Sequence, residues 1–194
     1  MRKNIWAFIL VLAIAIPYFW LKFRPKPDVK KLLKPIEINM DPDGSITRRY
    51  ILVDQINSLF AKQNCDSAEW KIDSALDVNP NDNMLIDLKG QSLMCKGQAR
   101  ESLKWFHIAV QNERFPRSLG HRAQAYTLLK MFDSATSDLK ECAIMNYDYN
   151  KDLGFVYEKA GLPDSAIKYF QIFLTNYPDS SRIQRAMLKL KNGG

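Results

Sequence analysis

One short motif recurs along this chain at intervals that constrain its fold. The tripeptide Asp-Ser-Ala ends at Ala68, Ala135 and Ala166. The first interval is about twice the second, and it divides into two nearly equal parts if the triplet that ends at Ser102 is counted as a degenerate copy. The resulting period of about 34 residues is typical of a chain that folds one small unit several times and stacks the copies on one another.

Apolar residues keep constant distances from these four anchor residues. An aromatic residue or Leu stands nine positions before each anchor, and a large apolar residue stands four positions after it. Twelve positions before the anchor, three of the four copies have Gly or Ala, which allow two helices to approach closely. The residues are Leu59, Leu93, Tyr126 and Tyr157 at the first position, Ile72, Phe106, Leu139 and Phe170 at the second, and Ile56, Gly90, Ala123 and Gly154 at the third.

This pattern resembles the tetratricopeptide repeat, a family in which about 34 residues form one pair of antiparallel helices. The last copy has the family's residues at Leu153, Gly154, Tyr157, Gly161, Ala166, Phe170 and Pro178. The first copy keeps only Ala68, Ala75 and Pro80, and the second departs at Ser102. The resemblance implies an all-α solenoid of about four helix pairs over 49–82, 83–115, 116–146 and 147–180, followed by a capping helix and tail over 181–194.

Helix ends are also marked in the repeats. Asp66, Asp133 and Asp164 stand where the second helix of a repeat is expected to begin, and the positive end of the helix dipole favours a carboxylate there. Gly97 and Gly161 predict the turns inside the second and fourth repeats, because a helix often ends on a glycine in the left-handed conformation.

The N-terminal apolar run over 5–23 predicts a single transmembrane helix that stays attached to the protein. At 1.5 Å per residue, its residues span about 28 Å, close to the thickness of a bilayer core. A cleaved signal peptide is the alternative interpretation, because the tail 1–4 is basic and Ala13-Ile14-Ala15 resembles a cleavage site. The run continues through bulky aromatic residues to Phe23, which favours the uncleaved anchor.

The net charge of +7 lies near the N-terminus and not in the repeats. Positions 1–35 hold eight Lys or Arg and one acidic residue, whereas in 36–194 the basic and acidic residues are equal in number. We therefore expect no nucleic-acid binding. Basic residues at the end of the predicted span and in the linker 24–48 are suited to contact anionic lipid headgroups, and a solvated charged linker is the alternative. They are Lys22, Arg24, Lys26, Lys30, Lys31 and Lys34.

The expected location is the cell membrane, crossed once. The positive charge that follows the span favours a cytoplasmic repeat region, and the opposite orientation stays open because the N-terminal tail is short. The three cysteines, Cys65, Cys95 and Cys142, are odd in number and lack a C-x-x-C pair, so they do not predict a disulfide framework. Cys142 stands where two other copies have Ala, which predicts a buried thiol.

Residue types that carry catalysis are scarce. The chain has two His, and no nucleophile, base and orienting residue stand at a recognisable spacing. Neither His is placed for metal binding with a Cys or a carboxylate, and there is no Gly-rich phosphate loop. We therefore expect neither an enzyme nor a bound metal or cofactor.

The resemblance to tetratricopeptide repeats implies that the first helices line a concave groove in which ligands bind. Counting along the copies places Asn57, Gln91, Gln124 and Phe155 at one groove position. Side-chain amides both donate and accept hydrogen bonds, so three of them in a ladder are suited to hold an extended peptide; solvated polar positions are the alternative. The neighbouring groove positions are Val53, Asp87, His121 and Lys151.

Two interpretations of function follow. In the first, the protein is a membrane-anchored adaptor or scaffold whose groove binds a peptide or a partner protein near the membrane. In the second, it is an accessory subunit of a larger membrane complex, held by its membrane helix and by the outer face of the repeats. Chaperone-binding members of the family clamp a C-terminal carboxylate with clustered basic residues, but Val53 and Asp87 break that pattern here.

Overall fold

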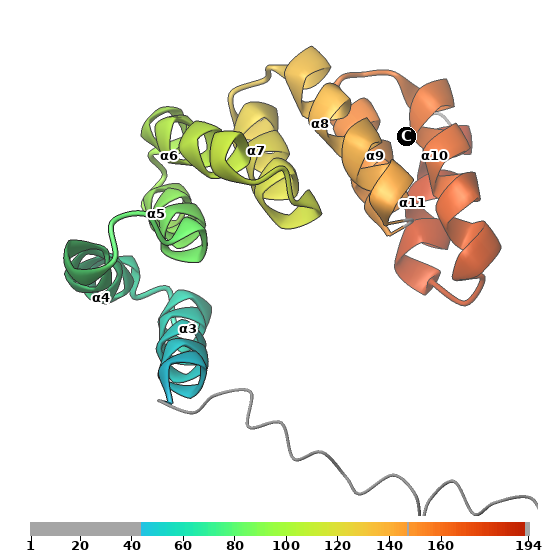
Figure 1. The fold of residues 1–194 in the computed structure, drawn as a ribbon. Helices are drawn as coiled ribbons and strands as arrows, with labels where there is room; N and C mark the ends of the chain where they lie inside the picture. Colours follow the sequence, from blue (N-terminus) through green and yellow to red (C-terminus); the bar gives the residue numbers. More distant parts are fainter. Residues whose placement is uncertain (1–43, 147, 193–194) are drawn as a thin grey trace, which may run out of the picture. The chain divides into compact units, whose positions relative to one another are not determined.

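The computed structural model describes residues 44–146 and 148–192 of the chain. Within the described ranges every regular element is an α-helix (Figure 1). The helices are α3 Ser45–Ala61, α4 Cys65–Val78, α5 Asn83–Cys95, α6 Ala99–Asn112, α7 Pro116–Leu128, α8 Phe132–Met145, α9 Tyr149–Lys159, α10 Pro163–Asn176 and α11 Ser181–Lys191.

The predicted helical repeats are therefore confirmed over the described residues. The predicted membrane span 5–23 and its basic flank lie outside these residues. Among the helices of the described ranges, none combines the length and the apolar character that crossing a bilayer requires.

From α4 to α11, successive helices pack on one another along the chain (Figure 1). The closest neighbours are the pairs α5 with α6, α7 with α8, and α9 with α10, and consecutive pairs meet where α6 contacts α7 and α8 contacts α9. The last helix, α11, packs against α10 through the buried Ile183 and the partly buried Met187 and Leu190, whereas Leu188 is exposed.

The four anchor residues are buried inside the repeats. Ala68, Ser102, Ala135 and Ala166 are all completely buried. Ser102 is the polar exception, and its hydroxyl donates a hydrogen bond of 2.8 Å to the carbonyl oxygen of Ala99. Because the hydroxyl is satisfied within its own helix, the degenerate copy keeps the packing of the other three.

Inside each repeat, the residue twelve positions before the anchor packs against the residue four positions after it. A Cβ atom added to Gly90 would lie 2.5 Å from the Phe106 ring, and one added to Gly154 would lie 2.3 Å from the Phe170 ring. In the third repeat, Ala123 and Leu139 occupy the two positions in one buried cluster. A smaller residue on one helix is thus matched by a larger one on the other, which keeps the interface filled.

The first repeat departs from this rule because both positions carry isoleucine. Ile56 and Ile72 are fully buried in one cluster, but α3 and α4 do not reach the close backbone contact of the other three pairs. Leu85 and Leu88 of α5 complete this cluster. The core of the first repeat therefore depends on the second repeat.

The turn inside each repeat contains one residue in the left-handed conformation, five positions before the anchor. Gly97 and Gly161 have φ of 77° and 73°, which confirms the two predicted turns. Gln63 and Lys130 adopt the same conformation, with φ of 55° and 60°. The sequence did not indicate these two turns, because neither position has the glycine that usually marks a positive φ. The strain of a side chain in this conformation is offset by the packing of the surrounding helices.

We expect Gly90→Ala to lower the free energy of unfolding by about 1 to 3 kcal/mol, because the new methyl group overlaps the Phe106 ring. Adding Phe106→Leu should recover part of this loss, since the double variant copies the pair formed by Ala123 and Leu139. Urea denaturation followed by circular dichroism measures the three variants. The prediction fails if the double variant is destabilised by the full sum of the two single changes.

Candidate partner-binding groove

Two pockets lie along the first helices of the repeats. The α7/α9 pocket has a volume of about 370 Å³ and the α5/α7 pocket about 460 Å³, and Arg117 lines both. The α7/α9 pocket is lined by Arg117, Gly120, His121, Gln124, Thr127, Leu128, Leu139, Tyr149, Asp152, Phe155, Val156 and Lys159. The α5/α7 pocket is lined by Arg49, Asn83, Met84, Asp87, Glu113, Phe115, Pro116, Arg117 and Ser118.

Three of the predicted groove residues meet in the α7/α9 pocket. His121 and Gln124 come from α7 and Phe155 from α9. The Phe155 ring packs edge-on against Phe170 at 5.1 Å, and the Arg182 guanidinium lies 5.1 Å from the centre of the Phe155 ring. The Phe155 side chain is thus contacted by Phe170 of its own repeat and by Arg182 of α11, and it also lines the pocket.

Asp87, Gln91 and His121 form a polar link between α5 and α7. The Asp87 carboxylate is 1% exposed, its oxygens lie 3.0 and 3.1 Å from Nδ1 of His121, and Gln91 Nε2 donates to it at 3.1 Å. Burial of a carboxylate is costly unless hydrogen bonds satisfy it, and the Asp87 carboxylate has hydrogen-bond partners in both His121 and Gln91. Asp87 therefore positions His121 and Gln91 within the protein.

One of the neighbouring groove positions, His121, is out of register with the others by one residue. Asp87 and Lys151 stand fifteen positions before their anchors, but His121 stands fourteen positions before its own. The residue that matches them in the third repeat is Gly120, where an added Cβ atom would lie 2.8 Å from the Tyr149 ring. Lys151 lies over the Phe173 ring at 5.8 Å.

The predicted amide ladder has unequal members. Asn57 and Gln124 are exposed, whereas Gln91 is partly buried and its NH₂ group is engaged by Asp87. Two of the three amides thus face solvent, and binding of a peptide by all three stays a prediction.

Known proteins resemble this chain in structure. No protein-family model and no curated protein matches the sequence. The structure matches a crystal structure of MamA at 18% identity and a TM-score of 0.62, covering 71% of this chain and 83% of MamA. It also matches a tetratricopeptide repeat protein from Parabacteroides merdae at 21% identity and a TM-score of 0.60, covering 74% of this chain and 60% of that one.

The chain has the tetratricopeptide repeat fold. A third match is a chain of the APC/C hetero-tetramer, with 16% identity, a TM-score of 0.65, and coverage of 72% of this chain and 29% of that one. At these identities the likeness concerns the fold, and it agrees with the resemblance read from the residues.

Asp152 is a groove residue that sequence reasoning missed. It lines the α7/α9 pocket beside the exposed Lys159, with Arg117 on the neighbouring helix. Burial raises the pKa of the Asp152 carboxyl, and Lys151 and Arg182 offset only part of this effect. An acidic residue kept where its charge is disfavoured is typical of a functional site, and no repeat pattern marks it in the sequence.

The α5/α7 pocket contains a buried hydrogen-bond acceptor. Asn83 Nδ2 donates to the carbonyl oxygen of Ala109 at 3.1 Å and to Glu113 at 3.3 Å. Its Oδ1 atom is buried and receives no hydrogen bond from the described residues. A donor group of a ligand in this pocket would satisfy an atom that is otherwise costly to bury.

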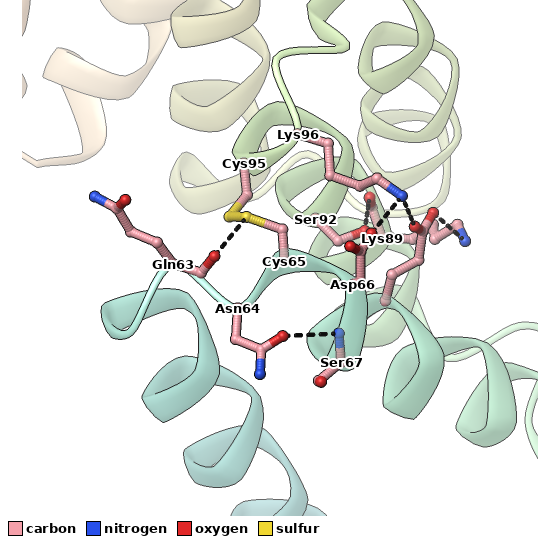
Figure 2. Close-up of a disulfide and its surroundings, with 10 residues drawn as sticks. Gln63, Asn64, Cys65, Asp66, Ser67, Lys89, Ser92, Cys95 and Lys96 are labelled. Atoms are coloured by element: carbon pink, nitrogen blue, oxygen red, sulfur yellow. Dashed lines mark hydrogen bonds and ion pairs between the residues drawn. A yellow bond between two sulfur atoms is a disulfide. The ribbon is translucent and has the colours of Figure 1, made fainter.

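The cysteine prediction was wrong, because Cys65 and Cys95 form a disulfide (Figure 2). The two residues lie 30 positions apart, in different repeats, and their Cα atoms are 5.7 Å apart. An odd number of cysteines leaves room for one bridge and one thiol. Cys142 is that thiol: it is buried as predicted, and burial raises its pKa to about 12.

Within the described residues, no group of three or more His, Cys, Asp or Glu side chains is placed to hold a metal ion.

We expect Asp152→Asn to stabilise the protein near neutral pH. A carboxyl whose pKa is raised in the folded state binds protons more tightly there than in the unfolded chain, so stability falls as the pH rises through the raised pKa. The advantage of the variant should therefore shrink as the pH is lowered through that pKa and vanish below the ordinary value of 3.8.

Thermal unfolding of both proteins across this pH range measures the effect. Asp77→Asn is the matched control, because it removes the same charge from an exposed side chain of α4. An advantage of Asp152→Asn that is equal at every pH would contradict the burial argument.

Proposed function

We propose that this protein is a membrane-tethered scaffold that binds a segment of a partner protein in the groove along its first helices. A role as a scaffold for protein–protein interaction agrees with the tetratricopeptide repeat fold of the structural neighbours. Binding in the groove is supported by the α7/α9 pocket, which apolar and charged side chains line together.

The α7/α9 pocket suits an extended segment with one apolar side chain. Leu128, Leu139 and Val156 provide apolar contact area, and Gln124 provides an amide that both donates and accepts hydrogen bonds. Charges of both signs lie around it on Arg117, Asp152 and Lys159. Such a combination of a mostly apolar lining with a few polar groups is typical of binding sites.

Pocket variants test this proposal. We expect Gln124→Ala with Lys159→Ala to weaken partner binding about fivefold to a hundredfold, because two hydrogen bonds contribute about 0.5 to 1.5 kcal/mol each. The matched control is Gln171→Ala with Lys168→Ala, which removes the same two side-chain types from exposed positions of α10. The measurement is quantitative mass spectrometry of proteins that co-purify from mild detergent.

A photo-crosslinking amino acid gives an independent reading of the same site. Placed at the exposed Gln124 it should crosslink the partner, and placed at Ile144 of α8, which is 88% exposed, it should not. Crosslinking at Ile144 alone would contradict the groove proposal.

The second candidate function is an accessory subunit of a membrane complex. It is favoured by one structural neighbour, a chain of the APC/C hetero-tetramer, in which the same fold belongs to a hetero-oligomer. Replacing residues 5–23 by a polyleucine span separates the two functions. The scaffold should keep its partner after this exchange and lose it in the pocket variant, whereas a subunit held by its span should show the reverse.

We also propose that the repeats lie on an oxidising side of the membrane. The Cys65–Cys95 disulfide supports this orientation, because such bridges are rare in the cytoplasm. The charge distribution around the predicted span favours the opposite orientation by the positive-inside rule.

Thiol labelling in cells distinguishes the two orientations. Cells are quenched with acid, and the protein is denatured and labelled with a maleimide that shifts its mobility. We expect one adduct, on Cys142, before reduction and three adducts after it, and Cys142→Ala should remove the first. Three adducts without reduction would place the repeats in a reducing compartment.

A further inference from the structure

The disulfide joins the first repeat to the second at one end of their shared interface (Figure 2). Cys65 is the first residue of α4, next to the turn after α3, and Cys95 is the last residue of α5. At the other end of the interface, Arg49 of α3 donates to Asp82, which caps α5, at 2.8 Å. Between these ends, Ile56 packs against Leu85 and Leu88.

The first repeat has little internal packing of its own. Its helices α3 and α4 lack the close backbone contact that the other three pairs make, because Ile56 and Ile72 fill both facing positions. Its turn also places Gln63 at a φ of 55°, where the second and fourth repeats have glycine. The position of α3 therefore depends on what holds it to α5.

Ion pairs also join α4 to α5 and to the residue that follows it. Lys89 pairs with Glu69 and Asp73, and Lys96 pairs with Asp66 and Glu69. Hydrogen bonds from Lys96 and Lys89 lower the pKa of Glu69. The Lys96–Asp66 pair is the most exposed of them, with side-chain exposures of 31% and 86%, so salt weakens it most, whereas Lys89 and Glu69 are 11% and 18% exposed and their pair is screened less.

We propose that the Cys65–Cys95 disulfide is a redox latch that holds the first repeat on the second and completes the α5/α7 pocket. Cys95 is exposed, so a dithiol reductant reaches its sulfur. One thiolate of the reductant attacks Sγ of Cys95 and releases Cys65 as a thiolate, which takes up a proton. The second thiol of the reductant, as its thiolate, displaces Cys95, so both cysteines end as thiols and the dithiol becomes a disulfide.

Opening the latch changes the groove. With the covalent link gone, the ion pairs and the apolar cluster still hold α3 and α4 on α5, and salt weakens the exposed pairs among them. When these yield, Arg49 leaves the α5/α7 pocket, which it lines together with Asn83 and Asp87. An effect of this change on partner binding rests on the proposed function, whereas the latch itself is tested without any partner.

Hydrogen exchange of the full chain, with reductant and salt varied independently, tests the latch. With the disulfide intact, amides of 45–78 should exchange slowly at low salt and at about 1 M salt, a concentration that weakens exposed ion pairs. After reduction at high salt, their exchange rate should rise at least about tenfold. This is a smaller increase than the one expected if the whole stabilisation from closing a loop of about 30 residues were lost. Amides of 116–176 should not change.

Cysteine variants provide the matched controls. Cys65→Ala with Cys95→Ala should reproduce the reduced form without reductant, and Cys142→Ala should behave as the unaltered protein. Unchanged exchange over 45–78 in both the reduced protein and the double variant would overturn the latch. An equal rise over 116–176 would overturn it as well, because the bridge would then support the whole stack and not one repeat.

Discussion

The contact on which this structure depends joins the two helices of each repeat, between the residue twelve positions before the anchor and the residue four positions after it. Phe106 and Phe170 lie where Gly90 and Gly154 leave space, so close that a single methyl group would overlap either ring. Because the two residues must match in volume, they determine how near the helices come. That distance in turn places each first helix beside the first helix of the next repeat.

In the first repeat the same two positions are buried in one cluster, but the match of a small residue with a large one is absent. With Ile56 and Ile72 at the two positions, α3 and α4 stay further apart, and the second repeat takes over their support. The helices of the first repeat are held by three kinds of contact with the second: the disulfide at one end of the junction, ion pairs between α4 and α5, and leucines of α5. In the second and fourth repeats, the glycine and phenylalanine pair holds the two helices together. Among the described repeats, the disulfide thus lies beside the pair of helices that lacks a close backbone contact.

The groove residues divide into those that join repeats and those that face solvent. Asp87 belongs to the first kind, because its buried carboxylate is satisfied by His121 and Gln91. Gln124, Arg117 and Lys159 belong to the second and surround a pocket that also contains the partly buried Asp152. Burial disfavours the charged form of the Asp152 carboxyl, and packing alone does not account for an acidic residue at such a position. The α7/α9 pocket is therefore a better candidate for binding than the residues that join repeats.

The sequence by itself determined the helical repeats, because a pattern with a period of about 34 residues reports packing that each copy repeats locally. It also indicated Gly97 and Gly161, and it led to His121, Gln124 and Phe155, which share one pocket. Only the tertiary structure decided which polar residues bind one another and which cysteines join. Asp87 meets His121 in the next repeat, and Cys65 meets Cys95 across a repeat boundary. Such pairs depend on the angle at which neighbouring repeats stack, and spacing along the chain carries no record of that angle.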